Sequence, residues 1–371
     1  MLENLIVLDT PDRSARQNRC FDPYREYIGA GYYIGVRLAR EARRRLMDIV
    51  TSDVYLETKK HPNKAACVTE MVTPFTDKLL LGGTIPSICM SLESPLNNKK
   101  YYHNVKHYAG RFHHSYQFRG IKDRLLGTDT IFHPIVFPMD TKNPLPLRPW
   151  TKRKYLVLVN SNKRSVYQNW RNCKECARSI VARVRAMYYY TVDPWMRIRE
   201  GYRDRVEAIK YFASQSELEL YGFGWDQPIR GYEKDYHHAA LKAYKGTILG
   251  GLRGKRDIIS RYKFALCFEN CVFPGYVTEK IFDCFLAGCI PVYYGAPDVS
   301  DFIPRECFID LRQFEDFPML DSFLSEMTEG QAKCYIDAAT DFLSSATFEK
   351  FTADYFVNDV LNVIEEELQS K

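Results

Sequence analysis

The chain has 371 residues, and at roughly 100–200 residues per domain this length predicts two domains. Hydrophobic residues make up 46% of the chain and charged residues 26%, which is typical of globular proteins and excludes a disordered, collagen-like or coiled-coil chain. No uncharged apolar run approaches the roughly 18 residues that span a bilayer, and the N-terminus, with Glu3 and a short apolar run, lacks the features of a signal peptide. We therefore expect a cytoplasmic protein that is at most peripherally associated with a membrane.

Eleven cysteines are scattered along the chain. Their odd number and the expected location favour reduced, mostly buried thiols over disulfides. Cys173 and Cys176 form one CxxC pair, but no second pair follows at the spacing of a zinc ribbon. Cys267 and Cys271 lie in an apolar context without a nearby histidine, so we predict no metal site.

The first part of the chain begins with a predicted strand, helix and strand, an order that is typical of an open parallel sheet. The predicted strands of this part are residues 5–8, 53–56, 85–92 and 131–137, and the predicted helix is residues 33–50. Residues 138–154 are rich in proline, mixed with Asp, Asn and Lys. Because such stretches resist regular structure, they are the best candidate for a linker.

Alternation of strands and helices resumes after this stretch. The predicted strands are residues 155–159, 217–221, 263–268 and 289–294, and the predicted helices are residues 204–213, 278–287 and 351–368. This alternation places helices on both faces of a parallel sheet. The last helix is expected to close the structure.

The segment 160–202 is dense in Arg and Lys with interleaved Tyr and Trp. Basic residues among aromatic ones can bind single-stranded nucleic acid. The net charge of the whole chain is only +6, however, and no recognition motif for RNA or DNA is present, so we expect no nucleic-acid partner. An insertion that lies near an anionic substrate is the other interpretation.

The stretch 262–295 has the most informative pattern of the chain. It predicts a buried strand, a loop with Pro274 and Gly275, a helix with Thr278 at its N-cap, and a second buried strand. Glu279 and Lys280 lie in the first helical turn, where free N–H groups and the helix dipole favour an anion. A lysine there is electrostatically unfavourable unless an anion binds, and a neighbouring glutamate can accept hydrogen bonds from a ribose. The pattern fits a sugar nucleotide at the C-terminal edge of the sheet, and an ordinary exposed Glu–Lys pair is the equal alternative.

The segments FENCVFPGYVTEK and LAGCIPVYYGAPDVSDFIP resemble the signature of the α1,3/4-fucosyltransferases, particularly the bacterial type. The resemblance is dense over residues 200–310 and extends to the segment SLESP in the N-terminal part. It implies an α/β protein of GT-B architecture, with two Rossmann-like domains facing a cleft. Residues 1–150 would receive the acceptor, residues 151–345 would hold GDP-fucose, and residues 346–371 would form the closing helix.

The resemblance also implies roles for individual residues. Glu279 matches the residue that binds the ribose, and Lys280 and Arg205 match the cations on the pyrophosphate, with Arg203 as the alternative to Arg205. Three further positions match residues that line the donor: Lys255, Asn270 and Tyr276.

Glu93 in the segment SLESP matches the candidate general base of the family. The residues themselves place it at the C-terminal end of a predicted strand, although a loop carboxylate before a proline is the simpler alternative. An inverting transfer needs one such group to take the proton of the acceptor hydroxyl. Two fixed cations can stabilise the departing diphosphate without a metal.

The resulting expectation is an inverting transferase that moves L-fucose from GDP-fucose to an N-acetylglucosamine-containing oligosaccharide or glycolipid, in α1,3 or α1,4 linkage. No cofactor is expected to be required, and a divalent cation would at most stimulate the reaction. The alternatives are a transferase for another GDP-sugar and a non-catalytic protein that binds glycans or nucleotides. Acceptor contacts are expected in the loop 101–116, where four histidines without an accompanying carboxylate would be exposed: His103, His107, His113 and His114.

Overall fold

A computed structural model of the chain describes residues 4–27, 31–58, 64–141, 145–162, 184, 188, 191–193, 198–215, 217–226 and 234–370. The chain divides into two units: the first comprises Met1–Glu93, Lys100–Asp140 and Glu349–Lys371, and the second comprises Ser94–Lys99 and Thr141–Phe348. Each unit contains a six-stranded parallel sheet, which confirms the expected α/β class with two Rossmann-like sheets. Most of the basic and aromatic segment 160–202 lies outside the described residues.

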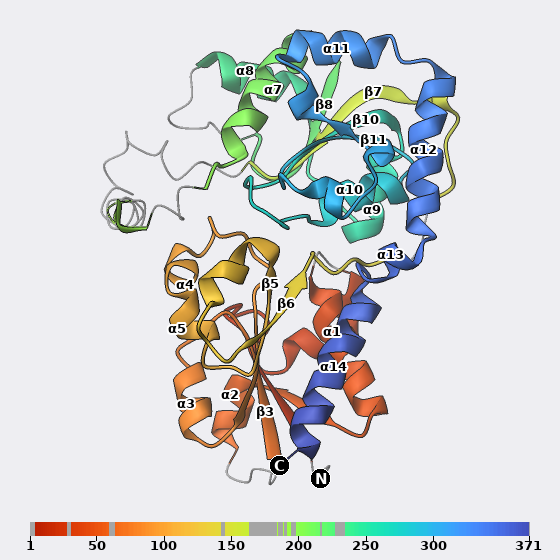
Figure 1. Ribbon diagram of the computed structural model, residues 1–371. Helices are drawn as coiled ribbons and strands as arrows, with labels where there is room; N and C mark the ends of the chain where they lie inside the picture. Colours follow the sequence, from red (N-terminus) through yellow and green to blue (C-terminus); the bar gives the residue numbers. More distant parts are fainter. Residues whose placement is uncertain are drawn as a thin grey trace. The chain divides into compact units, whose positions relative to one another are not determined.

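The first sheet has the strand order β2-β1-β3-β4-β5-β6 (Figure 1). Its strands are β1 (Asn4–Asp9), β2 (Asp48–Thr51), β3 (Lys64–Glu70), β4 (Ile85–Met90), β5 (His114–Phe118) and β6 (Ile131–Ile135). The helices of this unit are α1 (Tyr32–Arg44), α2 (Ser52–Glu57), α3 (Thr76–Leu81), α4 (Lys99–His103), α5 (Val105–Ala109) and α14 (Ala353–Gln369). In Figure 1, α1 and α14 lie on one side of the sheet and α3, α4 and α5 on the other. Because both faces are covered, the central strand β3 is buried at five consecutive positions.

Two predictions for this part of the chain were wrong. The predicted helix 33–50 ends at Arg44, because Leu46 adopts a left-handed φ of 59° and the next residues form β2. The predicted strand 53–56 is part of α2, since β2 already fills the edge of the sheet beside β1. Asp53 lies in the first turn of α2, where a carboxylate is favourable, and accepts a hydrogen bond from the backbone N–H of Gln17.

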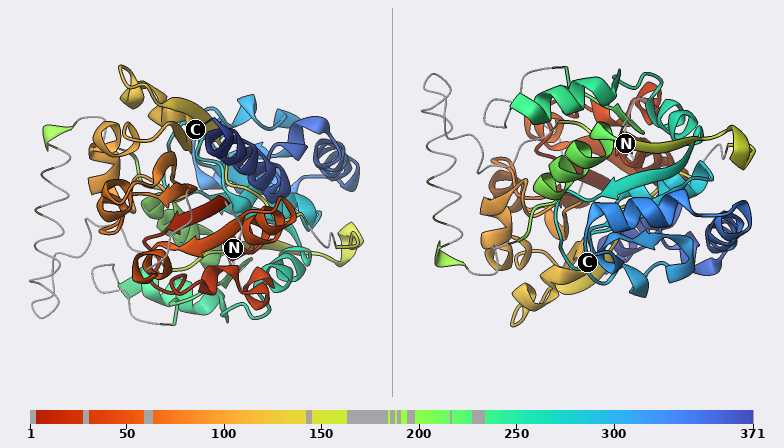
Figure 2. Two further views of the ribbon diagram at one scale, coloured as in Figure 1. Left: turned by 90° about the horizontal axis from the view of Figure 1, so that it is seen from below. Right: turned by 90° about the horizontal axis from the view of Figure 1, so that it is seen from above.

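The C-terminal helix returns to the first unit. The predicted helix 351–368 is α14, which packs against α1, β3 and β4 and lies beside α1 in Figures 1 and 2. Backbone hydrogen bonds join Met139 to Phe351 and Ala353, so the segments that leave and re-enter the first unit run side by side. The chain therefore changes unit after Asp140 rather than at the expected boundary 150/151, and Trp150 is already part of the core of the second unit.

The second sheet has the strand order β12-β11-β10-β7-β8-β9. Its strands are β7 (Lys154–Val159), β8 (Leu218–Tyr221), β9 (Tyr244–Gly246), β10 (Tyr262–Phe268), β11 (Ile290–Tyr294) and β12 (Ile309–Asp310). The helices are α7 (Tyr202–Ser214), α8 (Lys234–Ala243), α9 (Gly251–Ile259), α10 (Glu279–Leu286), α11 (Phe317–Ser325), α12 (Glu329–Leu343) and α13 (Ala346–Glu349). The four strands and two helices predicted between residues 155 and 294 are confirmed as β7, β8, β10, β11, α7 and α10.

The core of the second unit lies between its sheet and the helices α7, α8 and α11. Leu156, Phe264 and Val292 from three neighbouring strands pack there with Ile209 and Phe212 of α7. The intervening strand residues point to the opposite face, which α9 and α10 cover. With helices on both faces, ligands can approach such a sheet only at its edges or at the ends of its strands.

Both sheets have one point at which the strand order reverses. Counted from β7 as the first strand, the second sheet has the order 3-2-1-4-5-6 of dinucleotide-binding domains, and its order reverses between β7 and β10. In the first sheet the order reverses between β1 and β3. Ligands of open parallel sheets bind beyond the carboxyl ends of the strands at this point. Ligand sites are therefore expected at the residues that follow Val159 and Phe268 in the second unit, and at those that follow Asp9 and Glu70 in the first.

Candidate active site

The loop from β10 to α10 has the local structure that its sequence predicts. Gly275 adopts a positive φ of 76°, and its N–H donates to Asp298. Thr278 occupies the N-cap position of α10 in an extended conformation, as expected, but its side chain does not cap the helix. The Thr278 hydroxyl instead lies 2.8–2.9 Å from the carboxylate oxygens of Glu269. The loop is thus tied back to the end of β10.

Glu269 is the fully buried anchor of this loop. Its Oε1 accepts the backbone N–H of Thr278 at 2.8 Å, and its Oε2 accepts the ammonium of Lys280 at 2.9 Å. Two glycines leave room for it: a Cβ on Gly295 would lie 2.5 Å from Glu269 Cγ, and a Cβ on Gly201 would lie 2.1 Å from the Glu269 carbonyl oxygen. Glu269 was not among the residues predicted for the site, although a carboxylate directly after an apolar strand was a signal that could have indicated it.

Lys255, Glu279 and Lys280 form a cluster at the first turn of α10. Glu279 Oε1 lies 3.7 Å from the ammonium nitrogen of each of the two lysines. Asp283, one turn further along α10 and fully buried, lies 2.7 Å from Lys255 Nζ and accepts Arg256 Nε at 2.9 Å. Neither Asp283 nor Arg256 was predicted from the sequence. The signal that could have indicated Asp283 was a carboxylate at the fifth position of the helix segment EKIFDCFL, where its neighbours in the sequence are apolar.

The charges of this cluster are strongly coupled. Burial alone would raise the pKa of Glu279, but Lys280 and Lys255 outweigh it and hold the pKa at about 2. Burial alone would lower the pKa of both lysines, whereas Asp283 and Glu279 raise that of Lys255, and Glu269 and Glu279 raise that of Lys280. All three side chains are therefore ionised at neutral pH, in a setting that suits a charged or strongly polar ligand.

Arg205, Asn270 and Tyr276 lie around the same strand end. Arg205 of α7 is 2% exposed, and its Nη2 donates to the carbonyl oxygen of Phe268, the last residue of β10, at 3.1 Å. Arg203 points away from the core and is exposed, so the geometry favours Arg205 of these two candidates. Asn270 Nδ2 lies 3.4 Å from the hydroxyl of Tyr276. The six residues expected to line the donor are thus gathered at β10 and the turn that follows it.

Glu93 belongs to the first unit, whereas the cluster belongs to the second. It is exposed in a bend after β4, and the hydroxyl of Tyr102 donates to its carbonyl oxygen at 2.5 Å. Glu93 lines a cavity of about 530 Å³ at the carboxyl ends of β1 and β3, where the strand order of the first sheet reverses. Thr10, Asp12 and Glu70 line the same cavity. Glu70 was not among the residues predicted from the sequence.

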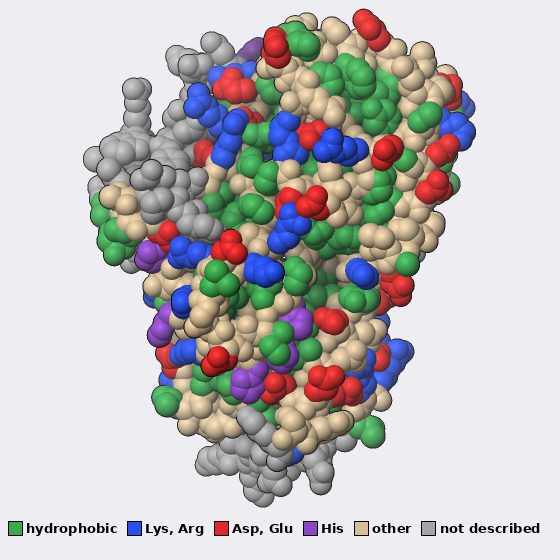
Figure 3. All heavy atoms as spheres, viewed as in Figure 1, with side chains coloured by type: hydrophobic (Ala, Val, Ile, Leu, Met, Phe, Trp, Pro, Cys, Tyr) green, Lys and Arg blue, Asp and Glu red, His purple; other side chains and the backbone are tan. Residues whose placement is uncertain are grey.

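The expectation of exposed loop histidines without a carboxylate was wrong for two of the four. His113 Nδ1 lies 2.7 Å and His114 Nε2 lies 3.3 Å from the carboxylate of Glu367 on α14. His114 is a residue of β5, and its ring nitrogen lies 2.9 Å from that of His133 on β6. These contacts join α14 to the sheet. Most histidine side chains visible in Figure 3 lie on this unit.

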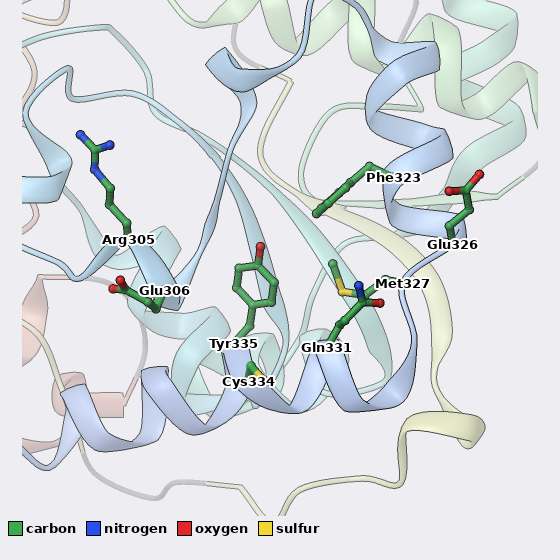
Figure 4. A pocket seen from close by; sticks show the side chains of 8 residues that line it. All are labelled: Arg305, Glu306, Phe323, Glu326, Met327, Gln331, Cys334 and Tyr335. Carbon is green, nitrogen blue, oxygen red and sulfur yellow. The ribbon is translucent and has the colours of Figure 1, made fainter.

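Other candidate sites are few among the described residues. No described group of three or more His, Cys, Asp or Glu could hold a metal ion, and no described helix is long and apolar enough to cross a membrane. The nine cysteines in the described segments are free, eight of them buried and Cys334 exposed. A second cavity, of about 600 Å³, lies between α11, α12 and the segment 305–306 (Figure 4). Its lining, which includes Phe323, Met327 and Tyr335, contains none of the predicted site residues.

Comparisons with known proteins find similarity in the part of the chain that contains this cluster. Residues 200–337 match the family described as "Glycosyltransferase family 10 (fucosyltransferase) C-term". The α-(1,3)-fucosyltransferase FucT of Helicobacter pylori is 42% identical over 74 residues, which cover 20% of this chain and 15% of that protein. An α-(1,4)-fucosyltransferase of Arabidopsis thaliana is 38% identical over 69 residues, which cover 19% of this chain and 17% of that protein. The chain is therefore matched to less than a fifth of the length of these relatives.

A solved structure extends the likeness to the whole fold. The Anabaena protein HepE in complex with UDP-glucose superposes with a TM-score of 0.52 and 11% identity, over 99% of this chain and 100% of that chain. At this identity the likeness shows the fold alone, which is the expected GT-B fold of glycosyltransferases. The residues of the β10–α10 cluster, from Arg205 to Lys280, all fall inside residues 200–337, the segment that matches the glycosyltransferase family 10 (fucosyltransferase) model.

Proposed function

We propose that the protein is an inverting fucosyltransferase, which transfers L-fucose from GDP-fucose to a hydroxyl group of an N-acetylglucosamine-containing glycan in α1,3 or α1,4 linkage. The observation that carries the proposal is the cluster of Lys255, Glu279 and Lys280 at the start of α10. It lies beside β10, at the point where the strand order of the second sheet reverses, and within a family 10 domain.

The donor nucleotide would meet a cluster whose formal charges balance. Its members are three cations and three carboxylates: Lys255, Arg256 and Lys280, and Glu269, Glu279 and Asp283. The positive potential that a diphosphate needs therefore comes from Arg205 and from the N–H groups at the start of α10. Lys280 is 13% exposed and reaches the surface of the cluster, so its ammonium can turn from Glu269 to a phosphate oxygen. Glu279 would accept hydrogen bonds from the ribose.

In the proposed reaction Glu93 takes the proton of the acceptor hydroxyl. The hydroxyl oxygen forms a bond to C1 of fucose while the bond from C1 to the phosphate oxygen breaks on the opposite side, so the configuration at C1 is inverted. GDP leaves with the electron pair of that bond. Arg205 and Lys280 would stabilise the charge that develops on the leaving phosphate.

Product analysis tests the proposal directly. Purified protein is incubated with GDP-fucose and an N-acetyllactosamine acceptor, GDP release is measured, and the linkage of the product is determined. We expect one fucose transferred per GDP released and a single α1,3 or α1,4 product. Folded protein that releases no GDP with any acceptor would contradict the proposal. Faster turnover of another GDP-sugar would favour that donor, and glycan binding without GDP release would favour a non-catalytic protein.

Variants test the individual roles. Glu93→Gln should abolish turnover but retain GDP binding, and the exposed Glu57→Gln serves as the matched control that keeps full activity. Arg205→Lys should weaken GDP binding more than Arg203→Ala, because only Arg205 lies at the end of β10. Equal affinity of these two arginine variants for GDP would show that Arg205 is not part of the donor site.

A further inference from the structure

The cavity of the first unit brings a second carboxylate close to Glu93. Glu70 is the last residue of β3 and pairs in register with Met90, the last residue of the neighbouring strand β4, after which the chain reaches Glu93. Both glutamates line the cavity of about 530 Å³. Glu93 is exposed, whereas Glu70 is partly buried and its Oε2 accepts the hydroxyl of Thr10 at 3.1 Å.

The surroundings of Glu70 disfavour its charge. The titratable side chains of the described cavity lining are three carboxylates, a tyrosine and a cysteine, and the lining contains no Lys, Arg or His: Asp12, Glu70, Glu93, Tyr32 and Cys20. The α14 residues on its wall, Phe356, Val357 and Val360, are apolar. Burial, and then the charges of Glu93 and Asp12, raise the pKa of Glu70 against the opposing effect of the Thr10 hydroxyl.

Two carboxylates in one cavity tend to have different pKa values, because burial favours the neutral form of the more buried one. We propose that Glu70 is a second acceptor-binding residue, which in its protonated form donates a hydrogen bond to the acceptor sugar and orients it toward Glu93. This inference rests on the proposed function. Glu93 takes the proton of the acceptor hydroxyl in the reaction, and Glu70 takes no part in that proton transfer.

Ionisation of Glu70 has a defined kinetic consequence. When the pH rises through the pKa of Glu70, this side chain loses its proton and becomes a second anion beside Glu93. The acceptor sugar then loses the hydrogen bond that Glu70 donated. The KM for the acceptor therefore rises on the alkaline side of this pKa, while the KM for GDP-fucose, which is bound by the other unit, stays constant. An acceptor that carries a carboxylate or sulfate near the reacting hydroxyl is expected to bind more weakly than its uncharged counterpart.

Three variants distinguish this role from a structural one. Glu70→Gln keeps a hydrogen-bond donor of the same shape but cannot ionise. At low pH its acceptor KM should therefore stay within about twofold of the wild-type value, and the rise of this KM at higher pH should disappear. Glu70→Leu loses the donor, and its acceptor KM should rise about tenfold at every pH. Thr10→Val removes a hydrogen bond that favours the ionised form and should move the alkaline rise to higher pH.

The measurement is the pH dependence of the acceptor KM and of the kcat of the full-length protein, with GDP-fucose and uncharged N-acetyllactosamine as probes. An alkaline rise that persists in Glu70→Gln, or an unchanged acceptor KM in Glu70→Leu, would overturn the inference. If the wild type forms no fucosylated product, the proposed function fails, and Glu70 is then tested by calorimetric titration with the same acceptor. Weaker binding to Glu70→Leu than to the wild type supports the inference, and equal binding overturns it.

Discussion

The substitution Glu279→Gln tests whether the charge cluster at the start of α10 is as strongly coupled as its geometry indicates. The side chain is 18% exposed and lies 3.7 Å from the ammonium groups of Lys255 and Lys280. Its pKa falls from an ordinary 4.5 to about 2 in the folded protein. At about 1.4 kcal/mol per pKa unit, this difference corresponds to about 3 kcal/mol of the free energy of unfolding at neutral pH.

The sign of the effect fixes its pH window. Because the folded pKa of Glu279 is depressed, the contribution is fully present above pH 4.5 and is lost as the pH falls toward 2. Glu279→Gln should therefore be less stable than the wild type at pH 7, and the difference should shrink steadily below pH 4.5.

Tryptophan fluorescence during urea unfolding at a series of pH values measures this difference. Trp150 and Trp225 are buried in the core of the second unit, which also contains the cluster. The control is Asp337→Asn, which removes a carboxylate from an exposed ion pair with Lys333 on α12 and should leave the unfolding midpoint nearly unchanged. A stability loss in Glu279→Gln that is constant from pH 7 to acid, or no larger than that of the control, would refute the coupling of the cluster.

Two further substitutions test the packing around this site. Arg256→Met leaves the fully buried Asp283 with only one of its two cations. We therefore expect a loss of about 3–5 kcal/mol in the free energy of unfolding, measured by urea titration. A smaller loss would mean that water reaches the Asp283 carboxylate. Gly201→Ala places a Cβ 2.1 Å from the carbonyl oxygen of Glu269 and should cost roughly 1–3 kcal/mol and weaken GDP binding in calorimetry. Gly330→Ala, which meets open space in α12, should instead be neutral or slightly stabilising, and equal effects of the two alanines would contradict the close approach at Gly201.

The strands and the turn at the β10–α10 site were predictable because their signals are local. The buried strands are short apolar runs, and a helix start is encoded in its own first turn. The same local logic failed at Asp53, where a β-like sequence forms α2 because the place beside β1 is taken by residues 48–51. Which of two segments occupies the edge of a sheet depends on tertiary contacts, and these cannot be predicted from a short stretch of sequence.

The buried charges were harder to predict than the fold. Asp283, Arg256 and Glu70 were missed because each depends on a partner that is distant in the sequence or on the depth of a cavity. The contact between His113 and Glu367 is a similar case, since it exists only because α14 returns to the first unit. Family resemblance indicated the residues proposed to contact ligands, such as Glu93 and Lys280, but not residues that hold such side chains in place, such as Asp283 and Arg256.

The balance of charge at α10 bears on how the donor would be selected. Lys280 is held by the buried carboxylate of Glu269 before any ligand arrives, so its position is fixed at the cost of part of its attraction for an anion. A phosphate that binds Lys280 must compete with Glu269, and free inorganic phosphate alone would do so poorly. If the proposed function holds, a nucleotide would form additional ribose contacts at Glu279 and would also reach Arg205, two interactions that the smaller phosphate anion could not combine. The arrangement therefore favours a complete nucleoside diphosphate over its fragments, and GDP should bind far more tightly than phosphate even though both present similar oxygens to the same lysine.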